Sequence, residues 1–230
     1  MPEFYEIRIY RVFDFEKQER LEAWMQDSLL PALGRLGISN VGVFRSQDPN
    51  DHSQFMVIPH QSLDQFSQLN LKLAQDTDFV KSSQSWFTQE MKAPAYQRID
   101  SWITQAFDSI PKMELPAYKA NPERVYELRL YESHNIDSAR RKVKMFDDGE
   151  TQLMRDTKLG PIFFGRTLAG PDSPNLIYMI GAENKKAHQE HWKAFLASEG
   201  WKGMKDLPEF ANTVSKIQKW QLKPTSFSQL

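Results

Sequence analysis

The sequence Tyr-Glu-Ile-Arg-Ile-Tyr at residues 5–10 returns as Tyr-Glu-Leu-Arg-Leu-Tyr at residues 126–131. Four positions are identical, and the other two exchange isoleucine for leucine. Further matches follow in the same order along the chain: Leu36-Gly37 with Leu159-Gly160, Phe55 to Ile58 with Leu176 to Ile180, and Ile99 and Trp102 with Ile217 and Trp220. Because ordered self-similarity indicates repeated structural units, the sequence predicts a tandem duplication of one unit.

Each copy predicts the order strand, helix, strand, strand, helix, strand. In the first copy we expect strands near 4–10, 40–46, 54–59 and 96–106, and helices near 15–36 and 62–76. Pro31 should kink or split the first helix, because proline has no N–H to donate. In the second copy we expect helices near 137–158 and 184–204. This βαββαβ order predicts an α+β fold of two ferredoxin-like units, each an antiparallel sheet with helices on one face.

A proline-rich segment separates the copies. Pro111, Pro116 and Pro122 fall within twelve residues, which is typical of an extended linker. The sequence therefore predicts a first domain at 1–112, a linker at 113–123 and a second domain at 124–230.

The first strand of each copy has two different faces, because successive side chains of a strand alternate. In the first copy Tyr5, Ile7 and Ile9 share one face, and the opposite face carries Glu6, Arg8 and Tyr10. We expect the aliphatic faces to pack on the helices. The charged faces of both copies would then meet inside a closed barrel, as a dimeric α/β barrel made within one chain. Alternatively, each Glu–Arg pair serves only to satisfy itself and to fix strand register.

The charged faces supply the candidate ligand-binding residues. The list is Glu6, Arg8, Tyr10, Glu127, Arg129, Tyr131 and Tyr178, with His60 and His134 as histidines near strand ends that could act as general bases. His188 and His191 lie three residues apart in a predicted helix, a spacing that could place two ligands for a metal on one face or offer one to haem. The many lysines beside them indicate a solvated helix, so no metal or cofactor is predicted.

Composition excludes several common functions. The formal net charge is -1, which gives no electrostatic reason to expect nucleic acid as a partner. There is no cysteine, which excludes thiol catalysis, disulfides and cysteine-based metal sites. No stretch is apolar enough to span a membrane, and the given chain has no signal peptide, so we expect a cytoplasmic protein. Phosphate-binding loops, dinucleotide fingerprints and serine-hydrolase elbows do not occur.

The motifs above resemble those of the NIPSNAP family. The twin opening strands, the Leu-Gly before the second strand of each copy, Gly165-Arg166-Thr167, Trp192-x-x-Phe195 with Trp201, and the tail 222–228 carry the resemblance. It implies a dimeric α/β-barrel fold, whose superfamily includes haem-degrading and quinone-forming monooxygenases, chlorite dismutase-like enzymes and isomerases. The first copy departs from the family in its second helix, where residues 69–79 lack an equivalent of Trp192.

Three functional hypotheses follow from this sequence. The first is a small-molecule-binding barrel, as in a cofactor-independent oxygenase or isomerase for an apolar or aromatic compound. The second is a non-catalytic interaction or assembly module that self-associates as a homo-oligomer. The third is a haem or metal protein. The sequence leaves the substrate and the partner undetermined.

Overall fold

The computed structural model describes all residues from 1 to 230. The elements of the first half are β1 (Phe4–Arg11), α1 (Phe15–Trp24), the π-helical turn η1 (Met25–Leu29), α2 (Leu30–Arg35), β2 (Gly42–Ser46), β3 (Gln54–His60), α3 (Leu63–Gln75), α4 (Thr77–Ser82), α5 (Gln84–Phe87) and β4 (Arg98–Ala106). The predicted helix at 15–36 is thus interrupted by a π turn, and Pro31, which has no N–H to donate, lies in the first turn of α2 immediately after it. Helices α4 and α5 were not predicted.

The second half has the same order of strands and main helices. Its elements are β5 (Val125–Glu132), α6 (Ile136–Met145), the π-helical turn η2 (Phe146–Glu150), α7 (Thr151–Asp156), β6 (Pro161–Ala169), β7 (Asn175–Ala182), α8 (Lys185–Ala197), α9 (Glu199–Lys205), the short 3₁₀ turn η3 (Pro208–Phe210) and β8 (Lys216–Pro224). The predicted helix at 184–204 is divided at Ser198, whose extended backbone ends α8 and whose side chain caps α9.

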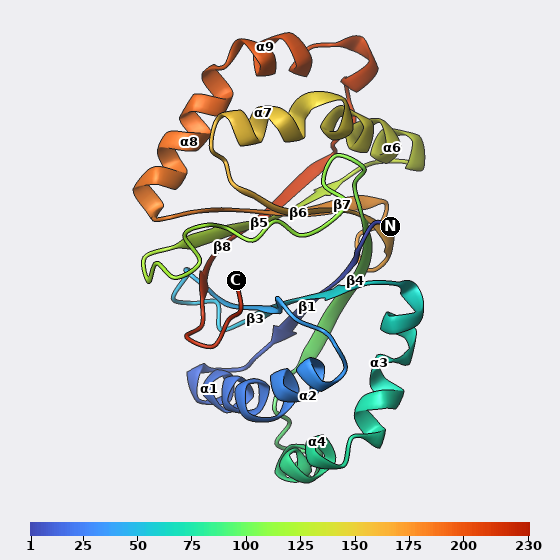
Figure 1. Cartoon of the computed structure of the whole chain (residues 1–230), viewed down its shortest axis with the longest axis vertical. Helices are drawn as coiled ribbons and strands as arrows, with labels where there is room; N and C mark the ends of the chain where they lie inside the picture. The colour runs from blue at the N-terminus through green and yellow to red at the C-terminus, as the bar shows by residue number, and fades with distance from the viewer.

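The eight strands form one closed antiparallel barrel in the order β1-β3-β2-β8-β5-β7-β6-β4. The halves join where β2 pairs with β8 and where β4 pairs with β6. The helices of the first half cover one side of the barrel and those of the second half cover the other (Figure 1). A closed barrel within one chain was expected, and it is confirmed. None of the helices combines the length and apolar character needed to cross a bilayer.

The barrel interior contains the aliphatic faces of the first strands, which corrects our expectation. Ile7 and Ile9 share a cluster of 17 buried residues with Leu128 and Leu130 of the other half. Glu6, Arg8, Glu127 and Arg129 alternate with these residues, so they lie on the outside of the barrel, beneath the helices. The prediction that the charged faces meet inside was therefore wrong, and the expected internal cavity is filled by apolar side chains.

Leu230 completes this interior core. It is fully buried and belongs to the same cluster. The preceding residues hold it there, because the Ser228 hydroxyl and the Gln229 side chain accept hydrogen bonds from the backbone amides of Val43 and Val41. In Figure 1 the C-terminal end lies between the strands of the two halves. The segment after β8 thus closes the barrel near the start of β2.

Candidate functional site

Glu6 and Arg8 form a closely bonded pair beneath the helices of the first half. Arg8 donates from Nε to Glu6 Oε1 at 2.6 Å and from Nη2 to Oε2 at 2.9 Å. Its Nη1 lies 3.4 Å from the Tyr10 hydroxyl, and His60 Nε2 lies 3.5 Å from Glu6 Oε2. Burial alone would raise the pKa of Glu6, but His60 and Arg8 lower it overall. Glu6 is therefore an ionised carboxylate that fixes the plane of the guanidinium.

A pocket of about 830 Å³ opens beside Arg8 and Tyr10, and we call it the first-half pocket. Thirteen of its 20 lining residues are hydrophobic, and they come from β1, β4, α1 and the segment from α3 to residue 99. Trp24 and Trp86 stack at 4.7 Å with an interplanar angle of 6°, and Tyr96 meets Tyr10 edge-on at 5.5 Å. The pocket is thus lined mainly by aromatic and aliphatic side chains, and its charged residues are Arg8, Arg98 and Glu90.

Glu127 is held differently in the second half. Its Oε2 lies 2.9 Å from His188 Nε2 and accepts a hydrogen bond from Trp192 Nε1 at 2.8 Å. Arg129 Nε lies 3.7 Å from Oε1, beyond hydrogen-bond distance, and the guanidinium lies 4.5 Å from the Trp192 ring centroid. Burial would raise the pKa of Glu127, but His188, Arg129 and Trp192 lower it overall. A histidine thus faces each buried glutamate, from β3 in the first half and from α8 in the second.

Two tyrosines continue this polar cluster. The hydroxyls of Tyr131 and Tyr178 lie 2.8 Å apart, and Arg129 lies 5.3 Å and 6.0 Å from their ring centroids. Burial raises the pKa of both tyrosines, so they stay protonated at neutral pH. Burial also opposes the charge of Arg129, yet Tyr178, Tyr131 and Glu127 raise its pKa overall. Arg129 is therefore a permanent cation.

A buried ion pair lies deeper in the same half and was missed by the sequence analysis. Lys142 Nζ lies 2.6 Å from Glu150 Oε2, with both side chains nearly inaccessible. Lys142 and Glu150 are the seventh and fifteenth residues after the N-cap of α6. The residues at the same two positions after the N-cap of α1 are Leu21 and Leu29, so the first half has no such ion pair. Burial raises the pKa of Glu150. Only a comparison of the two copies position by position could have found this pair.

Two predicted histidines lie apart from these clusters. His134 is exposed, and its Nε2 lies 3.3 Å from the Ser138 hydroxyl. His191 makes no hydrogen bond with the Glu127 cluster, so His188 and His191 do not act as a pair. No group of three or more His, Asp or Glu side chains converges in a way that could hold a metal ion. His188 is already engaged by Glu127 through Nε2.

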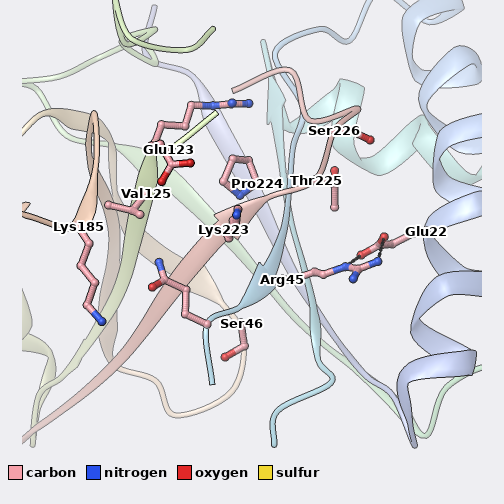
Figure 2. A pocket seen from close by; sticks show the side chains of 12 residues that line it. Glu22, Arg45, Ser46, Glu123, Val125, Lys185, Lys223, Pro224, Thr225 and Ser226 are labelled. Atoms are coloured by element: carbon pink, nitrogen blue, oxygen red, sulfur yellow. Dashed lines mark hydrogen bonds and ion pairs between the residues drawn. The ribbon is translucent and has the colours of Figure 1, made fainter. Parts of the chain in front are cut away.

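Another pocket, the seam pocket, lies where β2 and β8 join the halves. It measures about 680 Å³, and one of its 12 lining residues is hydrophobic. Figure 2 shows Arg45 turned toward Glu22, with Lys185 on the opposite side of the pocket. Arg45 and Glu22 form two hydrogen bonds of 2.5 and 2.6 Å, so these two charges neutralise one another. The seam pocket has little surface for an apolar ligand.

Solved structures of other proteins share this architecture over nearly the whole chain. A candidate monooxygenase from Lactobacillus acidophilus is 11% identical with a TM-score of 0.64, and the match covers 97% of this chain and 94% of that one. An anthrone oxidase-like protein is 11% identical, with a TM-score of 0.53 and coverage of 98% and 92%. A haem-binding protein from Thermus thermophilus is 9% identical, with a TM-score of 0.51 and coverage of 99% and 93%.

At such identities these matches establish the fold alone. The chain has a mixed α/β fold with a closed eight-stranded antiparallel barrel, and this fold is what it shares with these structures. A NIPSNAP family model matches residues 126–229, which lie in the second half of the chain. No curated protein matches the chain in sequence.

Proposed function

We propose that this protein binds a flat, apolar aromatic molecule in the first-half pocket, with Arg8 and Tyr10 contacting a polar oxygen of that ligand. One observation carries the proposal: a guanidinium lies on the wall of a pocket otherwise lined mainly by aromatic and aliphatic groups. Glu6 and Tyr10 use three of the five N–H donors of an arginine, which leaves two for a ligand. Ligand pockets commonly combine apolar walls with a few such polar groups.

The pocket owes its space to one sequence difference between the halves. Trp192, the eighth residue after the N-cap of α8, lies over Arg129. Asn70 is at the same position in the first half, eight residues after the N-cap of α3. Asn70 lines the first-half pocket. An amide is smaller than an indole, so Asn70 leaves room for a flat ligand beside Arg8, whose side chain is 13% exposed. We also propose that residues 1–112 and 124–230 are tandem ferredoxin-like copies joined by 113–123, of which the first diverged to bind this ligand.

The class of reaction that fits this pocket is cofactor-independent oxygenation or isomerisation of an aromatic compound. One structural neighbour is named for anthrone oxidation, and anthrone is a flat aromatic ketone. Arg8 and Tyr10 could polarise a ketone oxygen, because charged and hydroxyl donors stabilise negative charge that develops there. Glu6 would act as a positioning residue for Arg8.

Isothermal titration with a neutral flat ketone, 9-fluorenone, tests the proposal. Asn70→Trp should weaken binding at least tenfold, because removing about 60 Å² of apolar contact costs about 1.5 kcal/mol. Arg129→Gln is the matched control in the second half and should leave the affinity unchanged. Unchanged binding in Asn70→Trp would place the ligand elsewhere, and no binding by the unmodified protein would refute this ligand class.

A non-catalytic assembly module is the second candidate function. Two observations favour it: the barrel interior is filled, and Ile136 and Leu168 are exposed to 80% and 44% beside a pocket of about 580 Å³. Sedimentation velocity over a wide concentration range tests it. Self-association that Ile136→Asp abolishes would support the module, and a monomer at every concentration would contradict self-association.

A further inference from the structure

The second-half pocket differs in chemistry from the first. It measures about 780 Å³ and lies between α8 and the strands β5 and β8. Arg129, Lys193 and Lys219 line it, with Glu127 as the sole acidic residue. No acidic side chain lies within ion-pair distance of Lys193 or Lys219, since neither occurs in any salt bridge of the structure. The pocket therefore has an excess of positive charge.

Arg129 is the central cation, and its Nε lacks a hydrogen-bond acceptor. Its side chain is 14% exposed, and its Nε is buried without a hydrogen-bond partner. Glu127 does not supply one, because Oε1 lies 3.7 Å away and Oε2 is used by His188 and Trp192. The guanidinium carbon lies 4.5 Å from the Trp192 ring centroid, within the range of a cation–π interaction. Buried polar groups are nearly always hydrogen-bonded, so an unpaired buried donor in a pocket wall indicates that a ligand supplies the acceptor.

The surrounding charges are specific to the second half. Lys219 lies directly across from Arg129 in the β5–β8 pair, whereas Ser101 lies across from Arg8 in the β1–β4 pair. The ninth residue after the helix N-cap is Lys193 in α8 and Leu71 in α3. Like charges on directly opposed strand positions repel. An anion bound between Arg129 and Lys219 would attract both cations and so offset their repulsion.

We propose that the second-half pocket binds a small oxyanion, either a carboxylate or a phosphate group, in the plane of the Arg129 guanidinium with Lys219 and Lys193 as flanking charges. Guanidinium groups present N–H donors in a fork that matches two oxygens of such groups. The two halves thus hold pockets for different ligands. This site does not depend on the aromatic ligand of the first half.

Nuclear magnetic resonance of the Arg Nε–H groups tests the proposal directly. Titration of the full-length protein with inorganic phosphate, and separately with acetate, should shift the Arg129 Nε resonance along a saturable curve in at least one series. The series that saturates at lower concentration identifies the preferred oxyanion. A linear drift with no saturation in both series would overturn the proposal.

Three variants make the test specific. Lys219→Ser replaces an exposed lysine with serine, the residue type found at the matching strand position of the first half (Ser101). This change should weaken anion binding about tenfold. Arg129→Gln should abolish saturation of the heat measured by calorimetry, and its circular dichroism spectrum reports whether it is folded. Arg8→Gln, the equivalent change in the first half, should bind the anion as the unmodified protein does. Equal affinity in Lys219→Ser, or an equal loss in Arg8→Gln, would contradict this site.

Discussion

Leu230→Ala tests whether the barrel interior is a packed hydrophobic core rather than a ligand-binding cavity. Leu230 is fully buried in the interior cluster, and a Cβ on Gly42 would lie 2.8 Å from its Cδ1. Buried leucine-to-alanine changes cost about 2–5 kcal/mol. We expect about 3 kcal/mol here, which for a chain of this length lowers Tm by about 6–12 °C.

Urea denaturation followed by tryptophan fluorescence measures the loss. Leu207→Ala is the matched control, because Leu207 is 41% exposed and surface changes usually stay within about 0.5 kcal/mol. The slope of the unfolding free energy against urea should be the same in both variants. If Leu230→Ala is as harmless as the control, then Leu230 does not contribute to the core and the account of a filled barrel fails.

Three other perturbations have clear expected outcomes. Lys142→Leu should lower the unfolding free energy by about 3–5 kcal/mol, because it leaves Glu150 buried without its partner. Adding Glu150→Leu should recover most of this loss in the same urea experiment. If the double variant shows no recovery, the two residues do not act as a simple buried pair. The lowered pKa of Glu6 stabilises the fold above the ordinary glutamate value of 4.5, and this contribution is lost as the pH falls through the folded-state pKa. The stability difference between the unmodified protein and Glu6→Gln should therefore shrink in acid when melting curves are compared from pH 7 to 3, and a constant difference would contradict the pKa shift. Gly165→Ala should cost about 1–3 kcal/mol, because its Cβ would lie 2.3 Å from a threonine hydroxyl, whereas Gly203→Ala meets nothing within 4 Å and should not destabilise the protein in thermal melts.

Much of the candidate site could be predicted from the sequence, because its residues recur on one face of a strand. The structure does bring Glu127, Arg129, Tyr131 and Tyr178 together, and it places Arg8 and Tyr10 on the wall of a pocket. It also pairs His60 and His188 with the two glutamates, although one comes from a strand and the other from a helix. Apart from Tyr10, the aromatic residues of the first-half pocket were not predicted, because Trp24, Trp86 and Tyr96 come from three separate segments with no shared motif.

The order of the strands and main helices in both halves could be predicted from the sequence, as could the division of each first strand into an aliphatic and a charged face. Alternation could not show which face points into the barrel, because both faces are buried and the pattern contains no information about the elements that cover each face. The orientation of the faces depends on the packing of the whole chain. Inside a closed barrel a strand contacts mainly the side chains of other strands. Aliphatic side chains fill that space at the lowest free energy, because they leave no polar group unpaired. Outside, helices bring histidine and tryptophan donors that can satisfy a buried carboxylate, so the charged face lies beneath them.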